Sequence, residues 1–277
     1  MKQIRLAILD MYDNHPNEGM RCIHQLIQKT KEEEQIDLTV DVFNVRANNE
    51  LPGLDYDIYV STGGPGSPLP SSDAWERHYF SLIDRLFEYN RQNRQKKYVF
   101  LICHSFQLVA RHFRIGMISK RRSTSFGIFP IHRTDDGHSE PYFKALPDPL
   151  FAVDSRDFQL TSPNWNRIEE LGMKVLALEK IRPHVNLERA IMAVRFSNEI
   201  FGTQFHPEAD SAGMLRYFLT DEKRNQIVAN HGEAKYNEMV DSLQDPDKIR
   251  LTEAVIIPSF LRQAIRAFAP LTPQMHN

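Results

Sequence analysis

The chain of 277 residues contains only two cysteines, Cys22 and Cys103. Two isolated cysteines build neither a disulfide framework nor a cysteine-rich zinc site, and their scarcity is typical of a reducing compartment. No apolar stretch approaches the roughly 20 residues of a membrane-spanning helix. The start, MKQIRLAILDMYD, lacks a small-residue cleavage site and resembles a core strand more than a signal peptide. We expect a soluble, cytoplasmic protein with no metal site and no cofactor.

The sequence also lacks an excess of charge of either sign. Its 34 lysines and arginines are opposed by 36 aspartates and glutamates, which gives a formal net charge of -2. This balance offers no general attraction to nucleic acid or to an anionic membrane, so neither is expected as a partner. The short basic run KRR, from Lys120 to Arg122, is predicted to be a solvated loop.

Strands and helices alternate along the first half of the chain. Apolar runs such as IRLAIL, DIYV and YVFLI have the composition of buried strands, and helical periodicity separates them. This alternation predicts an α/β fold, an open and mostly parallel sheet with helices on both faces, of the flavodoxin-like kind. After about Ile118 short strands follow one another, which predicts an antiparallel addition to the sheet.

The last part of the chain has helical periodicity. Gly232 is a predicted helix terminator, and Ser259, after Pro258, is a predicted N-cap of the final helix. We expect an α/β domain over residues 1–220 and a helical C-terminal extension over 221–277 that packs on it. The apolar faces of the extension fit a cover for the sheet, a homo-oligomer surface or a docking site for a partner, and the sequence does not choose among them.

Cys103 stands where a strand meets a helix, within YVFLICHSFQLVARHF. A turn at the carboxyl end of a parallel strand lifts its side chain into the ligand crevice and aims the first N–H groups of the helix at it. Those partial positive charges favour a thiolate, the nucleophilic form of cysteine. Cys103 is therefore a candidate nucleophile, with a buried structural role as the alternative, whereas Cys22 is predicted to pack in the core.

The segment IFGTQFHPEAD offers a base and a group to orient it. Pro207 biases His206 toward an extended backbone, in which Glu208 lies on the same side as His206. A carboxylate there can accept the proton of one imidazole nitrogen and leave the other facing Cys103. The alternative is an exposed histidine and a solvated glutamate at the end of a strand.

A glycine-rich loop, STGGPGSP, follows the strand DIYV. Gly63 and Gly64 let the main chain approach a ligand closely. An N–H group of this loop, with the N–H of His104, could hold the oxygen of a tetrahedral intermediate. A phosphate loop is disfavoured because no Gly-Lys-Ser/Thr sequence follows, and a plain tight turn is the other alternative.

The motifs YDIYVSTGGPGSP, FLICHSFQLVA and IFGTQFHPE occur in the order found in class I, triad-type glutamine amidotransferases. The sequence resembles this family from the first strand to about Phe218, and is most similar to stand-alone chains like the amidotransferase domain of GMP synthase. What the resemblance implies for the site is a catalytic triad of Cys103, His206 and Glu208, an oxyanion hole of Gly64 and His104, and substrate binding by Gly63 and Gln107.

The predicted nucleophile turn departs from the family's pattern G-x-C-x-G-x-Q. Leu101 and Ser105 replace the glycines, with Leu101 placed to reshape the pocket wall, and VDSRDFQL replaces a histidine-bearing segment. The resemblance implies hydrolysis of a γ-glutamyl amide, either glutamine or another γ-glutamyl compound, through a glutamyl thioester. An ammonia acceptor would lie on a separate synthetase subunit, because no second nucleotide-binding motif follows His206. The altered turn motivates the alternative, a catalytically weak binding or regulatory module.

Overall fold

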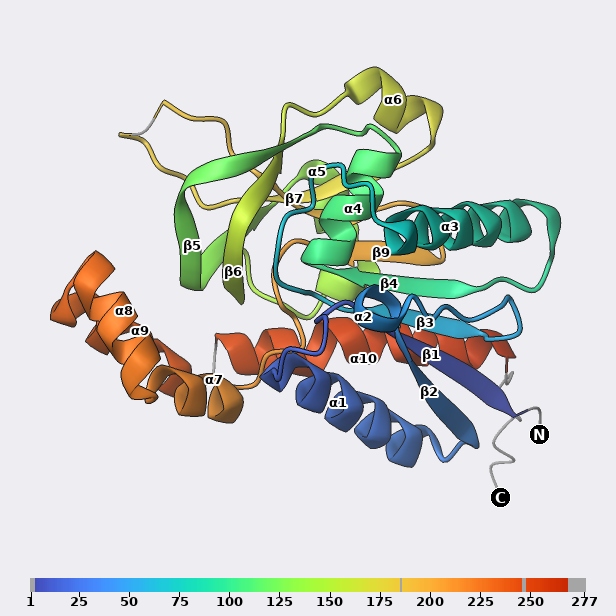
Figure 1. Ribbon diagram of the computed structural model, residues 1–277, viewed down its shortest axis with the longest axis horizontal. Coiled ribbons are helices and arrows are strands. Elements are labelled where there is room, and N and C mark those ends of the chain that lie inside the picture. The colour runs from blue at the N-terminus through green and yellow to red at the C-terminus, as the bar shows by residue number, and fades with distance from the viewer. Residues whose placement is uncertain (1–2, 185, 246–247, 269–277) are drawn as a thin grey trace.

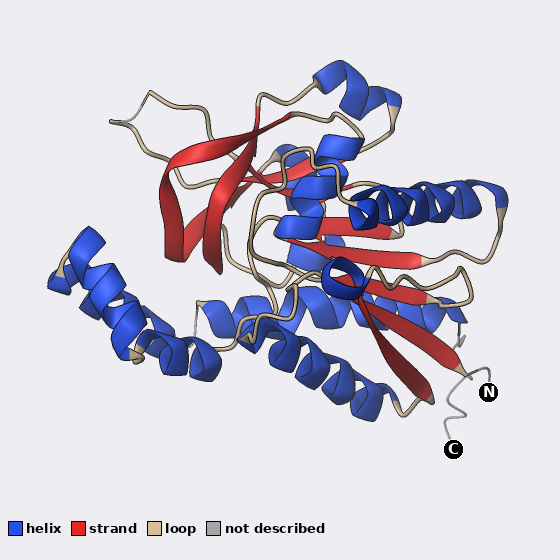
Figure 2. Ribbon diagram, viewed as in Figure 1, coloured by secondary structure: helices blue, strands red, loops and turns tan. Residues whose placement is uncertain are grey.

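The computed structural model describes residues 3–184, 186–245 and 248–268 and contains one mixed sheet (Figures 1 and 2). The strand order is β2-β1-β3-β4-β9-β8-β7-β5-β6, parallel from β2 to β9 and antiparallel from β9 to β6. The predicted α/β fold is confirmed. The strands are β1 (Ile4–Asp10), β2 (Leu38–Asn44), β3 (Ile58–Ser61), β4 (Tyr98–Ile102), β5 (Met117–Arg133), β6 (Leu150–Thr161), β7 (Lys174–Leu178), β8 (Ile191–Arg195) and β9 (Ile200–Thr203).

Helices cover both faces of the sheet. The first and last helices, α1 and α10, lie on one face, and α3 and α4 lie on the other (Figure 1). The helices are α1 (Glu18–Glu34), α2 (Val45–Asn48), α3 (Ala74–Gln92), α4 (His104–His112), α5 (Asp135–His138), the 3-10 helix η1 (Pro141–Phe143), α6 (Trp165–Glu170), α7 (Ser211–Phe218), α8 (Asp221–His231), α9 (Glu233–Gln244) and α10 (Ile249–Phe268).

The central parallel strands β3, β4 and β9 are buried along their whole length, because helices cover both faces of the sheet. In β1, Leu6 and Ile8 join the apolar core beneath α1 and α10, whereas Ala7 and Leu9 join the core on the opposite face. Successive side chains of a strand point to opposite sides of the sheet, so a doubly covered strand needs apolar residues at every position. The carboxyl ends of these strands form the edge at which ligands bind in such folds.

The antiparallel half is dominated by the long hairpin of β5 and β6, beside which α7, α8 and α9 lie (Figure 1). A separate apolar cluster joins these elements, with Phe126 from β5, Val153 from β6, Phe218 from α7 and Met239 from α9. Helices α7, α8 and α9 therefore contact the hairpin through a core of their own.

The basic run Lys120–Arg122 forms part of β5, so the loop prediction is wrong. Lys120 pairs with Phe158 of β6, and the register shifts between Lys120 and Ser125. Lys120 and Arg122 are exposed, whereas the side chain of Arg121 is largely enclosed. Successive side chains of a strand point to opposite sides, which is why Arg121 is enclosed while Lys120 and Arg122 are exposed. The sequence does not reveal this alternation, because all three residues carry the same charge.

The last helix, α10, runs unbroken through Pro258. The prediction that this helix begins at Ser259 is wrong. Pro258 is buried within α10, whose flanking residues Ile257 and Phe260 belong to the core beneath the sheet. Apolar packing along the helix thus outweighs the backbone hydrogen bond that a proline removes. Of the predicted extension over 221–277, residues 246–247 and 269–277 lie outside the described residues.

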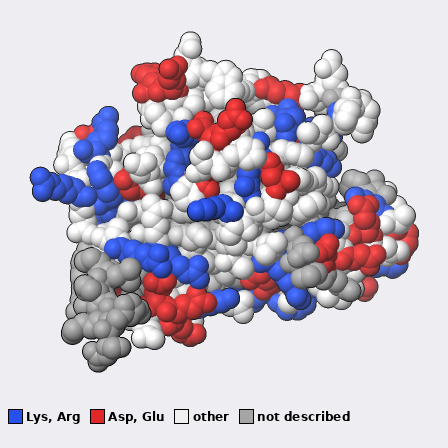
Figure 3. Space-filling view, turned by 180° about the vertical axis from the view of Figure 1, so that it is seen from behind, with Lys and Arg blue, Asp and Glu red and all other residues white. Residues whose placement is uncertain are grey.

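The surface carries mixed charge. Figure 3 shows basic and acidic side chains interspersed on the face opposite to that of Figure 1. No helix among the described residues combines the length and the apolar character needed to cross a membrane.

Candidate active site

Cys103 occupies the sharp turn between β4 and α4. Its backbone has φ 46° and ψ -95°, a conformation that costs a non-glycine residue on the order of 1–3 kcal/mol. The turn is held from both sides, because the amide of Cys103 donates to the carbonyl of Thr203 (2.7 Å) and its carbonyl accepts from the amide of Gln107 (3.0 Å). The thiol is therefore held at the carboxyl edge of the sheet.

The two residues that replace glycines near this turn have different environments. The hydroxyl of Ser105 donates to the carbonyl of Ser61 in β3 (2.8 Å) and accepts from the amide of Ile102 (2.9 Å), so it joins two strands. Leu101 lies in the apolar core on the α3 and α4 face and does not line the cavity described below. The expected effect of Leu101 on the pocket wall is therefore wrong.

His206 and Glu208 follow β9, the strand that neighbours β4. The Nδ1 atom of His206 lies 2.8 Å from Oε1 of Glu208, and the amide of His206 donates to the carbonyl of Val153 (2.9 Å). A carbon added at Gly63 would lie 2.9 Å from Cε1 of His206 and 3.6 Å from Cβ of Cys103. Both side chains thus border one glycine, and the fold brings the three predicted triad residues together.

Charges around His206 favour its protonated form. Burial alone would lower the pKa of His206, but the carboxylate of Glu208 and a thiolate at Cys103 outweigh it and raise this pKa well above its usual range. The neighbouring His104 behaves in the opposite way, because burial and then two nearby arginines lower its pKa to about 3. His206 is therefore the imidazole beside Cys103 that carries a proton at neutral pH.

Gly64 and His104 line the same cavity as Cys103, and their amides are the predicted oxyanion donors. A side chain at Gly64 would collide with the carbonyl oxygen of Met11, so only glycine permits this close approach of two loops. Within the described part of the chain the amide of Gly64 forms no hydrogen bond. His104 is the first residue of α4, where an amide has no intrahelical acceptor. Two N–H donors are thus available near Cys103.

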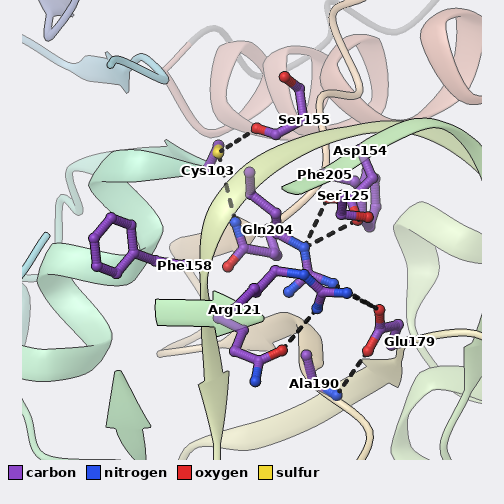
Figure 4. Close-up of polar contacts among 12 residues, drawn as sticks. Cys103, Arg121, Ser125, Asp154, Ser155, Phe158, Glu179, Ala190, Gln204 and Phe205 are labelled. Carbon is purple, nitrogen blue, oxygen red and sulfur yellow. Dashed lines mark hydrogen bonds and ion pairs between the residues drawn. The ribbon is translucent and has the colours of Figure 1, made fainter. Parts of the chain in front are cut away.

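Two glutamines contact each other beneath the sulfur. Nε2 of Gln204 lies 3.5 Å from Sγ of Cys103, and Nε2 of Gln107 donates to Oε1 of Gln204 (2.9 Å) and to the carbonyl of Phe158 (3.1 Å). The carbonyl of Ser155 lies 3.8 Å from the same sulfur (Figure 4). Gln204 was missed by sequence reasoning, although it lies two residues before the predicted base, on the same side of an extended segment.

Buried charges anchor β6 beside the thiol (Figure 4). Nε of Arg156 lies 2.9 Å from both carboxylate oxygens of Asp154, and its Nη2 lies 3.2 Å from Oε1 of Glu179. Nη2 of Arg121 lies 3.2 Å from that same oxygen. Because Ser155 stands between Asp154 and Arg156 in the chain, this network holds in place the carbonyl that faces Cys103.

A cavity of about 680 Å³ opens above these groups and is hereafter the main cavity. Sites for drug-sized ligands measure roughly 300–1,000 Å³, so it has room for more than one amino acid. Burial, followed by the charges of Glu208 and Cys103, raises the pKa of Tyr12 well above its usual range, so this lining phenol is a neutral donor. Gly63 is not among the residues that line the cavity. The predicted site residues that do line it are Gly64, Cys103, His104, Gln107, His206 and Glu208.

Cys22, in α1, also borders the main cavity and is buried, as predicted. Burial raises the pKa of its thiol to about 12, so Cys22 is protonated at neutral pH. Within the residues that the structure describes, no three histidine, cysteine, aspartate or glutamate side chains gather as metal ligands.

A family model described as glutamine amidotransferase class-I matches residues 18–224, a range that includes every predicted site residue. The chain is similar to a solved glutamine amidotransferase from Thermotoga maritima, with a TM-score of 0.67 and 12% identity, covering 96% of this chain and 99% of that chain. For a glutamine amidotransferase from Methylobacillus flagellatus the TM-score is 0.57, with 13% identity over 100% and 99% of the two chains. The glutaminase domain of Trypanosoma brucei CTPS with bound acivicin gives 0.56 and 12%, over 74% and 86%. No curated protein matches the chain.

Proposed function

The chain belongs to the class I glutamine amidotransferase family, and we propose that it cleaves a γ-glutamyl amide with Cys103, His206 and Glu208 as its triad. The substrate is glutamine or another γ-glutamyl compound, and the products are glutamate and ammonia or an amine. The observation that carries the proposal is the arrangement around Gly63, where His206 and Cys103 both border the glycine while Glu208 holds the far side of the imidazole.

In the first step, the thiolate of Cys103 attacks the γ-carbonyl carbon. A carbon–sulfur bond forms, and the electron pair of the carbonyl bond moves to its oxygen. The amides of Gly64 and His104 donate hydrogen bonds to this oxyanion, because both residues line the cavity with Cys103 and neither N–H group has an acceptor among the described residues. The tetrahedral intermediate is thereby stabilised.

In the second step, His206 donates its proton to the departing nitrogen, and the carbon–nitrogen bond breaks. The raised pKa of His206 supports this role, since the imidazolium keeps its proton at neutral pH beside the carboxylate of Glu208. Ammonia or an amine departs and leaves a γ-glutamyl thioester. His206, now neutral, accepts a proton from water as the water oxygen attacks the thioester, and glutamate is released with the thiolate restored.

Other residues hold the reacting groups. Gln107 and the backbone at Gly63 are proposed to bind the glutamyl portion, and Gln204 positions the sulfur through its 3.5 Å contact. If ammonia is transferred rather than released, a separate synthetase subunit holds the acceptor. The free thiols of Cys22 and Cys103 fit a reducing compartment, and we propose the cytoplasm.

The test is glutamate release from glutamine and from γ-glutamyl dipeptides by the wild type and by Cys103→Ala. We expect turnover by the wild type and a loss of at least about 10³-fold in kcat for the variant, because a triad without its nucleophile retains little activity. Thermal unfolding of both proteins is the control for folding. Equal turnover by the two proteins would remove the proposal, and no turnover by the wild type would favour a binding or regulatory module.

A further inference from the structure

A second cavity of about 370 Å³ adjoins the main one. The two share four lining residues, so they open side by side. The second cavity lies along the β5–β6 hairpin, at the register shift that separates the two strands after Lys120. Three successive cations of β5, at this register shift, line the second cavity. The residues common to both cavities are Gly66, Thr124, Asp157 and Phe158.

The walls of this second cavity carry unneutralised positive charge. Lys120, Arg121 and Arg122 all line it, and Asp157 is its one acidic lining residue among those described. The charge of Arg121 is neutralised by its ion pair with the buried carboxylate of Glu179. Lys120 and Arg122 form no ion pair with any described residue.

The one carboxylate in the wall is already engaged. Oδ1 of Asp157 accepts the hydroxyl hydrogen bond of Thr124 (2.5 Å). The hydroxyl leaves the charge of Asp157 at -1, so the two cations Lys120 and Arg122 still outweigh the one lining anion, on a protein whose overall balance is -2. Cations at the wall of a cleft attract an anionic ligand and raise its local concentration.

The second cavity lies at the glutamine-binding side of the main cavity. Phe158 lines both cavities, and its carbonyl accepts the hydrogen bond from Gln107 (3.1 Å). An extended substrate with its γ-carbonyl at Cys103 can therefore place a further group between the hairpin and the loop at Gly66.

We propose that the second cavity binds an additional carboxylate of the substrate, beyond the α-carboxylate of the γ-glutamyl unit, through Lys120 and Arg122. This inference rests on the proposed function and names its substrate class, a γ-glutamyl compound with an acidic extension. A carboxylate fits better than a phosphate, because phosphate sites usually gather several backbone N–H groups, and Gly66 is the one residue of the glycine-rich loop among the described residues that line this cavity. Here the two unneutralised donors are side chains on one strand.

The extension can be attached at either end of the γ-glutamyl amide, and matched substrates distinguish the two ends. One pair is Nα-succinylglutamine and its terminal amide, which differ in a carboxylate on the α-nitrogen. The other pair is γ-glutamylglycine and γ-glutamylglycinamide, which differ in a carboxylate on the departing amine. For the wild type we expect kcat/KM to be roughly two- to fivefold higher for the acidic member of at least one pair, as expected for an exposed charge-assisted contact.

The variant Lys120→Gln/Arg122→Gln removes the proposed contacts. Its kcat/KM for the acidic member should fall to that of the neutral twin, while the value for the neutral twin stays unchanged. The matched control is Arg94→Gln/Lys144→Gln, which changes net charge equally at two exposed residues that line neither cavity. This control should keep the preference, and added salt should weaken it in the wild type.

Equal rates for both members of both pairs in the wild type, or the same preference in wild type and Lys120→Gln/Arg122→Gln, would overturn the proposal while leaving γ-glutamyl cleavage intact. If no substrate turns over, calorimetric binding of the four compounds to Cys103→Ala decides instead. Tighter binding of the acidic member, lost on removal of Lys120 and Arg122, supports the subsite without catalysis, and equal binding rejects it.

Discussion

The two halves of the sheet contribute differently to the site. The parallel half, from β2 to β9, carries Cys103, His206 and the glycine loop at adjacent strand ends. The antiparallel half supplies the hairpin of β5 and β6, whose residues wall the main cavity and the second cavity. The proposed chemistry thus uses strand ends that parallel topology brings together, whereas one long hairpin contributes walls of both cavities.

We therefore expect substitutions in the two halves of the sheet to have different effects. Changes at the parallel strand ends should alter kcat with little change in stability, because they affect reacting groups. Changes in the hairpin and its helices should alter stability or substrate preference. The four predictions that follow test this separation.

Loss of the Glu208 carboxylate should have the largest effect. Glu208→Gln is expected to lower kcat by about 10³–10⁴-fold, because the imidazole loses its orienting anion. Since that carboxylate raises the pKa of His206, its removal lowers this pKa, and the alkaline limb of the kcat/KM profile should move to lower pH. Profiles from about pH 5 to about pH 10 measure both. Glu199→Gln, in the turn between β8 and β9, is the matched control, and an unmoved limb in Glu208→Gln would contradict the assignment.

A substitution in the hairpin should act on stability instead. Arg156→Met leaves the buried Asp154 without its ion-pair partner, while Glu179 keeps Arg121, and the unpaired carboxylate should cost about 3–5 kcal/mol in the free energy of unfolding. Urea denaturation measures the change. Arg94→Met, at an exposed position, should stay within about 0.5 kcal/mol of the wild type. A loss below about 1 kcal/mol for Arg156→Met would show that the network is not structural.

A methyl group at Gly63 should affect catalysis more than folding. It would lie 2.9 Å from Cε1 of His206 and displace the imidazole. We expect kcat for Gly63→Ala to fall by about 10²-fold, because small misplacements of catalytic groups are costly. Steady-state kinetics beside a thermal melt check both parts. If kcat of this variant equals that of the wild type, the assigned catalytic position of His206 is contradicted.

A methyl group at Gly232 should have the smallest effect, and only on stability. This glycine joins α8 to α9 with φ 85°, and no atom lies within 4 Å of an added side-chain carbon. The backbone conformation alone should therefore cost about 1–2 kcal/mol in Gly232→Ala. Unchanged kcat with a lowered melting temperature is the expected result. A fall in kcat would couple these helices to the reaction.

The parallel half could be predicted from sequence because its signals are local. Apolar runs bounded by glycines and a cysteine at a strand–helix junction identify strand ends, and parallel topology brings those ends together. The pairing of His206 with Glu208 follows from their two-residue spacing. The same spacing would have identified Gln204, whose contact with Cys103 was overlooked.

The antiparallel half was harder to predict from the sequence, for physical reasons. Lys120 and Arg122 resemble any exposed charges until β6 pairs beside them across a register shift. The ion network of Arg156 joins residues far apart in the chain and leaves no periodic pattern. Pro258 resembles a helix boundary, and only tertiary packing beneath the sheet keeps α10 continuous.

The central claim is that the thiol of Cys103 is made reactive by its neighbours. The most direct measurement is the intact mass and peptide map of the protein after brief exposure to a glutamine-like chloroketone at neutral pH. We expect one adduct, located on Cys103, in the wild type and in Cys22→Ala, none in Cys103→Ala, and slower labelling in His206→Ala. Labelling of Cys103 no faster than that of Cys22 or of a free thiol in solution would contradict this claim.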